Sequence, residues 1–264
     1  MDKFFTHLNA AIHYRVTGEG QPVVLLHGFG EDSSIWENQV AYLQSHCRLI
    51  IPDLPGSGKS ELLLGNNISI DDYAECIHQL LIHEEINPAI ILGHSMGGYI
   101  TLALAENYPG DLSKMGLIHS TAFADNEEKK INRQRGIEMI KKYGSHSFLK
   151  NTIPNLFSDN FKKNNYQVVE SLIDAGKTFT TDSLIQYTTA MMNRPDRTEV
   201  LKQATIPVLF IVGDQDTAAP LKDLKEQIYL PKQPYIHILE NVGHMGMLET
   251  TEEVNKIMLE FINR

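Results

Sequence analysis

The sequence has few cysteines and no long apolar run. Cys47 and Cys76 are the only two thiols among 264 residues. Two thiols are too few for a multi-bridge disulfide framework, so we expect both to be buried as free thiols. No run of about 18 apolar residues is present, as a membrane-spanning helix would require. The first residues also lack the basic stretch and apolar run of a signal peptide. We therefore expect a cytoplasmic protein with no membrane segment.

Positive charge is scarce as well. The chain has 23 Lys and Arg residues against 33 Asp and Glu residues, a formal net charge of −10 at pH 7. Binding to nucleic acid depends on Lys and Arg side chains that neutralise phosphates, and an anionic membrane surface also attracts basic segments. The composition thus argues against both kinds of partner. Metal-binding patterns such as H-E-x-x-H or paired C-x-x-C are absent too, so we expect no metal and no cofactor.

What the sequence does contain is an alternation of short apolar runs and amphipathic stretches. With 42% hydrophobic and 21% charged residues, the composition is that of an ordinary globular protein. Strands that alternate with helices imply a parallel α/β sheet covered by helices on both faces. A Ser-Ile-Trp-Glu stretch at residues 34–37 predicts a capping box before the first helix. We expect an N-terminal hairpin around residues 11–16 and further strands at residues 23–26, 48–51, 89–92, 115–118, 207–212 and 235–239.

The alternation stops in residues 122–205. This segment is rich in Lys, Asn, Glu and Thr and contains no convincing strand. Its apolar spacing predicts helices near residues 127–142, 161–175 and 181–193. We expect residues 1–121 and 206–264 to form one core, with residues 122–205 as a helical insertion after one of its strands.

The most specific chemical signal is G-x-S-x-G at residues 93–97. It follows the apolar run 89–92 and precedes a helical stretch, the context in which this pattern forms a sharp strand-to-helix turn. The turn is so tight that a side chain at Gly93 or Gly97 would clash. Ser95 would then stand above the sheet edge at a helix N-terminus, where amides and the helix dipole favour negative charge. We interpret Ser95 as a catalytic nucleophile; the alternative is a tight turn in which the serine only caps the helix.

A serine nucleophile needs a histidine base and a carboxylate that orients the base. On this architecture the three arrive in the chain order Ser, acid, His. Asp214 and Asp216 follow a predicted strand and His244 follows the last one, at the sheet edge where ligands bind in open α/β folds. We assign Asp216 as the acid and His244 as the base, with Asp214 as the competing acid. His119 at a strand end and His237 inside a strand are weaker candidates for the base.

Several segments together resemble the α/β-hydrolase superfamily, in particular its small esterase, lactonase and cofactor-free haloperoxidase members. The resemblance extends from about residue 20 to 250, except for the insertion. The matching segments are His27-Gly28-Phe29-Gly30 and residues 53–60, 93–98, 213–216 and 243–244. The resemblance implies an eight-stranded, mostly parallel sheet flanked by helices, and it identifies residues 122–205 with the cap that lies over the family's active site. The second acid of the G-x-x-D stretch is the family's triad member, which corresponds to Asp216.

The same resemblance implies an oxyanion hole. Acyl transfer builds negative charge on the carbonyl oxygen, and two preorganised backbone N–H groups stabilise it. The family's two donors correspond to the amides of Phe29 and Met96. The residues expected to border the substrate are Gly28, Phe29 and His94. The alternative for residues 27–30 is a simple loop after a strand.

A Gly-Ser-Gly-Lys-Ser stretch at residues 56–60 is similar to the end of a phosphate-binding loop. The pattern requires its first glycine at position 53, which holds Asp53. Asp53 puts a negative charge where a phosphate would bind. The neighbouring Pro52 and Pro55 lack the backbone N–H groups that would bind the phosphate. We interpret the stretch as a structural turn.

We therefore predict a serine hydrolase that cleaves small carboxylic esters or lactones through an acyl-enzyme. Ser95 attacks the carbonyl carbon, His244 takes and returns the proton, and Asp216 orients the imidazole. Haloalkane dehalogenases and epoxide hydrolases of this fold use an aspartate nucleophile, which is absent at position 95. A carbon–carbon bond hydrolase or a perhydrolase with the same triad is the alternative. A non-catalytic ligand receptor is a further one, and the oligomeric state is left open.

Overall fold

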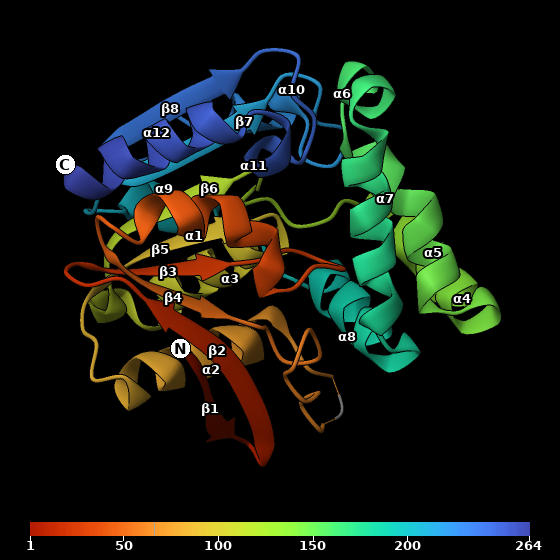
Figure 1. Ribbon diagram of the computed structural model, residues 1–264, viewed down its shortest axis with the longest axis horizontal. Helices are drawn as coiled ribbons and strands as arrows, with labels where there is room; N and C mark the ends of the chain where they lie inside the picture. Colours follow the sequence, from red (N-terminus) through yellow and green to blue (C-terminus); the bar gives the residue numbers. More distant parts are fainter. Residues whose placement is uncertain (66) are drawn as a thin grey trace.

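The structure, a computed structural model, describes residues 1–65 and 67–264. These residues form one eight-stranded sheet with the order β1-β2-β4-β3-β5-β6-β7-β8 (Figure 1). β2 pairs antiparallel with β1 and β4, and every other neighbouring pair is parallel. The predicted eight-stranded, mostly parallel sheet is thus confirmed. The strands are β1 (Asp2–His7), β2 (Ala10–Thr17), β3 (Pro22–Leu26), β4 (Arg48–Pro52), β5 (Ala89–His94), β6 (Leu112–Ile118), β7 (Val208–Gly213) and β8 (Pro234–Leu239).

The N-terminal hairpin turns at Leu8 and Asn9. Both residues have positive φ angles, 48° and 65°, as a two-residue turn requires when its twist matches that of the flanking strands. Asparagine tolerates this region better than most residues, which is why the sequence turns there. The hairpin pairs Thr6 with Ala11 and adds the antiparallel edge of the sheet.

Helices cover both faces of the sheet. α1 (Glu37–Leu43) packs beside α12 (Thr251–Asn263), and α2 (Ile70–His83) packs beside α3 (Met96–Asn107). Figure 1 shows α1 and α12 in front of the sheet and α3 behind it. β5 and β7 are buried along their whole length because both faces are covered, which explains their continuous apolar sequences. Cys47 and Cys76 are buried free thiols, as predicted.

The capping box predicted at residues 34–37 is wrong. A 3₁₀ turn, Ser33–Trp36, precedes α1, and Asp32 caps it by accepting a hydrogen bond from the Ser34 amide. The chain enters its helical turn earlier than the pattern indicates, because the Asp32 carboxylate satisfies the first free amide. Ser34 is therefore inside the turn rather than at its cap.

A block of helices separates β6 from β7. It consists of α4 (Glu127–Tyr143), α5 (Ser145–Thr152), α6 (Asp159–Asn164), α7 (Tyr166–Ala175), α8 (Thr181–Met192) and α9 (Thr198–Gln203). Figure 1 shows α4 to α8 grouped beyond one end of the strands, whereas α9 packs against α3. Two short helices, α10 (Leu221–Leu224) and α11 (Gly246–Glu249), follow β7 and β8. Among the described residues, no helix combines the length and the apolar character needed to cross a membrane.

Candidate active site

Ser95 lies in the turn between β5 and α3 with φ 50° and ψ −113°. Residues other than glycine rarely adopt a positive φ, and they keep it only where the surroundings hold the backbone in place. Here the Ser95 amide donates to the carbonyl oxygen of Ile118 at 3.0 Å, and the Ser95 carbonyl accepts from the Ser120 hydroxyl at 2.7 Å. Ser95 thus occupies the strained strand-to-helix turn that the G-x-S-x-G pattern predicts.

Glycines allow the close backbone approaches around this turn. A Cβ atom on Gly93 would lie 2.2 Å from the carbonyl oxygen of Gly97, and one on Gly97 would lie 2.4 Å from that of Leu26. A Cβ atom on Gly28 would lie 3.1 Å from the Ser95 Cβ. Both glycines of the pattern are therefore sterically required, and the segment after β3 lies directly against Ser95.

Asp216 and His244 meet at the carboxyl edge of the sheet, after β7 and β8. The His244 Nδ1 lies 2.8 Å from Asp216 Oδ2. The other carboxylate oxygen, Oδ1, accepts from the amides of Ala218 and Ala219, each at 2.8 Å. Both side chains are buried. Each Asp216 oxygen is therefore held, and the carboxylate fixes the plane of the His244 ring.

Asp214, the competing acid, is placed differently. Its side chain is exposed, and Oδ1 accepts a hydrogen bond from the Val242 amide at 3.3 Å. The Asp214 amide continues the pairing of β7 with β8 by donating to Leu239. The structure thus brings Asp216 to His244 and leaves Asp214 at the loop surface, while His237 lies within β8.

Burial and charge act in opposite directions on the Asp216–His244 pair. Burial lowers the pKa of His244, but the Asp216 carboxylate outweighs this and raises it above the ordinary histidine value. Burial raises the pKa of the Asp216 carboxyl, yet the neighbouring imidazoles hold it well below its usual range. Asp216 is consequently ionised at neutral pH, and a proton on His244 is stabilised.

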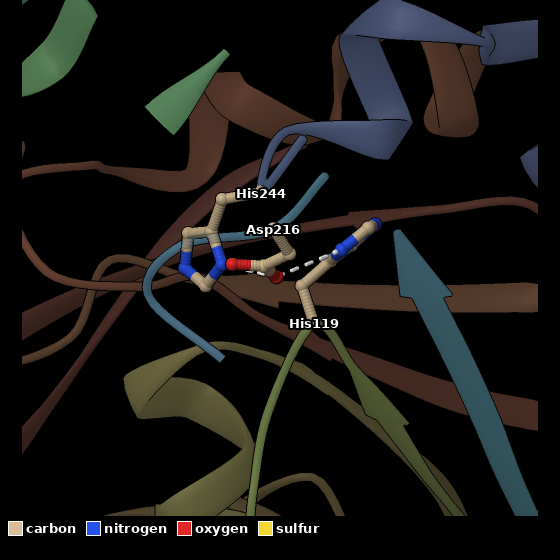
Figure 2. Close-up of side chains that lie close together, drawn as sticks. All are labelled: His119, Asp216 and His244. Atoms are coloured by element: carbon tan, nitrogen blue, oxygen red, sulfur yellow. Dashed lines mark hydrogen bonds and ion pairs between the residues drawn. The ribbon is translucent and has the colours of Figure 1, made fainter. Parts of the chain in front are cut away.

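His119 forms a second imidazole contact with the same acid. It follows β6, its side chain is fully buried, and its Nδ1 lies 3.3 Å from Asp216 Oδ2. Figure 2 shows the carboxylate between the two rings. Burial lowers the pKa of His119 to about 4, so this ring is neutral at neutral pH. The sequence indicated His119 only as a weak candidate for the base, not as a partner of Asp216.

The side chain of His94, which was predicted to border the substrate, lies beneath the turn and is fully hydrogen-bonded. The ring is fully buried, with Nδ1 3.0 Å from Glu31 Oε2 and Nε2 3.0 Å from the His244 carbonyl oxygen. Glu31 also accepts from the Gly28 amide at 2.7 Å. Burial would raise the pKa of Glu31, but His94 and this amide hold it below its usual value. The buried Glu31 and His94 side chains thus link the segment after β3 to the loop that carries His244.

Similar proteins confirm the family. The model of the α/β hydrolase fold matches residues 21–133. A thermophilic esterase from Thermogutta terrifontis superposes with a TM-score of 0.91 at 27% identity, over 96% of this chain and 93% of the esterase. The chain belongs to the α/β-hydrolase superfamily.

Two curated relatives of this α/β hydrolase align over nearly its whole length. The dihydrolipoyllysine-residue acetyltransferase component of the acetoin cleaving system from Pseudomonas putida is 30% identical over 95% of this chain, which spans 66% of that protein. The 2-hydroxy-6-oxononadienedioate/2-hydroxy-6-oxononatrienedioate hydrolase of Burkholderia vietnamiensis is 25% identical, over 96% of this chain and 91% of the relative. Family membership therefore covers several distinct reactions.

In this α/β hydrolase, two helices from the block between β6 and β7 contact the segment that follows β3. The Phe29 ring makes edge-to-face contacts with Phe148 of α5 and Tyr187 of α8, at centroid distances of 6.3 and 6.4 Å. A Cβ atom on Gly30 would lie 2.7 Å from a methyl carbon of Leu149. Phe29 is therefore flanked by two aromatic rings from the helical block.

The same block is hydrogen-bonded to the loop that carries His244. The His244 amide donates to the Leu156 carbonyl oxygen at 2.6 Å. The Glu249 carboxylate accepts from the amides of Gly243 and Ser158, at 3.0 and 3.1 Å. No sequence pattern identified Glu249, because its partners are backbone amides that carry no sequence signal. The loop that carries His244 is thus attached to the helical block mainly through backbone groups.

The stretch that resembles a phosphate-binding loop folds around Asp53. The Asp53 carboxylate accepts hydrogen bonds from the amides of Lys59 and Ser33, each at 2.9 Å. A Cβ atom on Gly58 would lie 2.3 Å from an Asp53 carboxylate oxygen. A negative charge thus occupies the concave side of the turn, where a phosphate-binding loop would hold its anion.

One group of side chains in the described part of the chain has donor types suited to a metal ion. It is the cluster of His119, Asp216 and His244, whose donor atoms lie within 4.8 Å of one another. The nitrogens that face Asp216 are at hydrogen-bonding distance, and a metal would require both to present lone pairs instead of hydrogens. Hydrogen bonds to an ionised carboxylate account for this arrangement.

Proposed function

We propose that this α/β hydrolase is a serine hydrolase that cleaves small carboxylic esters or lactones through an acyl-enzyme. The observation that carries the proposal is the buried Asp216–His244 pair, 2.8 Å apart, at the sheet edge where Ser95 is held at φ 50°. A serine hydroxyl becomes nucleophilic only when an oriented base takes its proton. The similarity to an esterase at 27% identity supports this reaction class.

In the proposed mechanism, Ser95 attacks the substrate carbonyl carbon and its proton passes to His244. Because Nδ1 of His244 faces Asp216, Nε2 is the nitrogen that takes the proton and later returns it to the leaving group. Asp216 stays ionised and stabilises the imidazolium. Water activated by His244 then releases the acid from the acyl-enzyme.

The oxyanion donors in this proposal are the amides of Phe29 and Met96. Within the described residues, neither N–H donates to another group, although the neighbouring Gly28 amide is bonded to Glu31. Both amides flank Ser95, one across the Gly28 contact and one directly next in the chain. Two free donors at this position suit the negative charge that develops on the carbonyl oxygen.

We assign residues 122–205 the role of a cap that selects the substrate, with α4 to α8 as its body. The contacts of Phe148 and Tyr187 with Phe29 support this role, because they place cap side chains beside the proposed oxyanion donor. Apolar side chains there favour the acyl part of a small ester, and the cap limits the entry of water.

A substrate panel tests the proposed reaction. Wild-type protein and Ser95→Ala, purified in parallel, are assayed on esters of graded acyl length, lactones and vinylogous diketones. We expect hydrolysis of esters or lactones that is lost in the variant. Ester hydrolysis of equal rate in both preparations would show that Ser95 is not the nucleophile.

Carbon–carbon bond hydrolysis is the second candidate. It is favoured by the similarity to the oxononadienedioate hydrolase of Burkholderia vietnamiensis, which extends over 96% of this chain. The same panel separates the two reactions: turnover of vinylogous diketones without turnover of esters would replace the ester proposal. A stoichiometric burst on activated esters without turnover would instead indicate a ligand receptor.

The rate should depend on pH through His244. The base must be neutral to accept the Ser95 proton, so kcat/KM falls as the pH drops through the His244 pKa. Asp216 raises that pKa. We therefore expect the acid limb of the profile, the fall of kcat/KM toward low pH, to have its midpoint above the ordinary histidine pKa of 6.5. Steady-state rates on one ester across the pH range measure the limb. A limb below the ordinary value would contradict the assignment of His244.

Phe148 is expected to control acyl-chain preference. Phe148→Ala removes the ring that packs on Phe29 and widens the site, so the kcat/KM ratio of longer to acetyl esters should rise about tenfold. Phe161→Ala is the matched control, because this cap ring stacks on Phe157 instead. Equal ratios in both variants and the wild type would show that Phe148 does not line the substrate site.

A further inference from the structure

The Asp216 carboxylate has two imidazole partners, and the proposed reaction uses only one of them. Oδ2 faces His244 Nδ1 at 2.8 Å and His119 Nδ1 at 3.3 Å. The centroids of the two rings lie 5.9 Å apart at an angle of 68°, with the carboxylate between them (Figure 2). The His119 and Asp216 side chains are completely buried. The role of this second histidine is therefore to be sought in its effect on Asp216.

The hydrogen-bonding pattern determines the tautomer of His119. An ionised carboxylate only accepts hydrogen bonds, so the nitrogen that faces it must carry a hydrogen. In a neutral ring this leaves Nε2 without one. Nε2 has no hydrogen-bond partner among the described residues and packs against Gly246, where a Cβ atom would lie 2.4 Å away. An N–H pointing into this contact would be buried without an acceptor, so the Nδ1–H tautomer fits the site.

The backbone aims this ring at Asp216. β6 lies between β5 and β7 in the sheet, so its carboxyl end lies between the strands that carry Ser95 and Asp216. His119 has φ 48°, and its amide donates to the Ile211 carbonyl oxygen of β7 at 2.8 Å. A residue other than glycine keeps such a conformation only where its surroundings enforce it, which often occurs at functional sites.

We propose that His119 is a positioning residue that donates a hydrogen bond to Asp216 and so limits how strongly this acid raises the basicity of His244. The inference rests on the proposed serine-hydrolase function. Two donors on one oxygen share its negative charge, so less of that charge acts on the His244 imidazolium. The acid limb of the rate profile is then set jointly by His119 and Asp216.

Other charged groups around the two rings stay constant in the test. Besides Asp216 and His119, the groups that face His244 are His94, with its ring 4.9 Å away, and the carboxylates of Glu31 and Glu249. The His94 ring also lies 6.1 Å from His119. Because burial lowers the pKa of His119 to about 4, its own titration falls outside the neutral range in which the acid limb is expected.

Three substitutions at position 119 separate the donor from the side-chain volume and the backbone. His119→Asn places an amide nitrogen near the Nδ1 position and tolerates a positive φ, so it keeps the donor. His119→Leu removes the donor but keeps most of the volume. His119→Gly removes it without backbone strain, which guards against misfolding of the leucine variant. His237→Leu, at a histidine within β8 and outside the site, is the matched control.

The measurement is the pH profile of kcat/KM on one ester, with the melting temperature of each variant recorded alongside. In His119→Leu and His119→Gly we expect the acid limb to move to higher pH, because the full negative charge of Asp216 then stabilises the His244 imidazolium. The plateau should fall by about tenfold or less, as for the loss of one hydrogen bond. His119→Asn and His237→Leu should keep the limb at its wild-type position.

Three outcomes would overturn the inference. The acid limb could stay unchanged in the leucine and glycine variants, or move equally in His119→Asn. A plateau loss as large as that of Ser95→Ala would also overturn it, since His119 would then be a base. In all three cases Ser95→Ala remains the separate test: if that variant keeps its activity, the proposed function fails, and if it is inactive, only the inference about His119 fails.

The wild-type protein offers an independent check that needs no variant at position 119. Nitrogen-15 NMR of histidine-labelled protein distinguishes the two neutral tautomers and the cation. We expect the His119 signals to be those of the Nδ1–H tautomer at pH 7. A neutral ring that carries its hydrogen at Nε2 instead would contradict the proposed hydrogen bond.

Discussion

Replacing Ser95 with alanine is expected to abolish ester hydrolysis while leaving the fold intact. The change removes one hydroxyl group from a turn whose backbone is held by Ile118 and Ser120, so the melting temperature should change little. Members of a triad act as a unit, and loss of the nucleophile costs on the order of 10⁶ in kcat. Burst and steady-state kinetics on an activated ester measure the loss.

The control for this experiment is protein free of contaminating esterase, because a trace of wild-type enzyme would mask so large an effect. Titration with an active-site serine reagent reports contamination directly. Turnover of Ser95→Ala within tenfold of the wild type would exclude Ser95 as the nucleophile.

The second large effect is expected at Asp216. Asp216→Asn leaves the His244 ring beside an amide, which favours the wrong tautomer, and should reduce kcat by about 10⁴. Asp214→Asn is the matched control two residues away: this side chain is exposed and contacts the Val242 amide at 3.3 Å. It should cost little activity, with a small loss of stability from the weakened loop.

The ranking of these two variants decides the assignment of the acid. Rates on the same ester, together with thermal unfolding, distinguish a catalytic loss from a folding defect. If Asp214→Asn loses more activity than Asp216→Asn at equal stability, Asp214 is the triad acid and the loop rearranges in solution.

The sheet could be predicted from the sequence because its central strands are buried on both faces. The apolar runs within β5 and β7 are shorter than an ordinary helix, so their length favours strands. Ser95 was equally accessible to prediction, since its turn requires glycines at 93 and 97 for steric reasons. Local sequence carries this information because the physical constraint is itself local.

Other features depend on neighbours that are distant in the chain. Asp214 and Asp216 both follow β7, but the Asp214 amide pairs with Leu239 and its side chain is exposed, whereas the Asp216 side chain faces His244. The His119 contact with Asp216 spans 97 residues. It could have been suspected from the strand order, because the end of β6 lies between those of β5 and β7.

Helix ends within the proposed cap were also difficult to predict. The apolar spacing of residues 161–175 indicated one helix, whereas the structure has α6 and α7 with a break at Asn165. Asparagine has a weaker helix propensity than most residues, so a helix is more easily interrupted there. The spacing of apolar residues alone does not reveal such interruptions.

The attachment of the loop that carries His244 to the helical block has a consequence for how members of this family diversify. The bond from the His244 amide ends on the Leu156 carbonyl oxygen, and Glu249 holds the Ser158 amide. Because the groups that the helical block contributes are main-chain atoms, the attachment does not depend on the side chains at positions 156 and 158. Mutation can therefore remodel the lining of the block without moving the histidine. A transplanted block would retain the position of His244 provided that its backbone followed the same path and position 249 remained a glutamate.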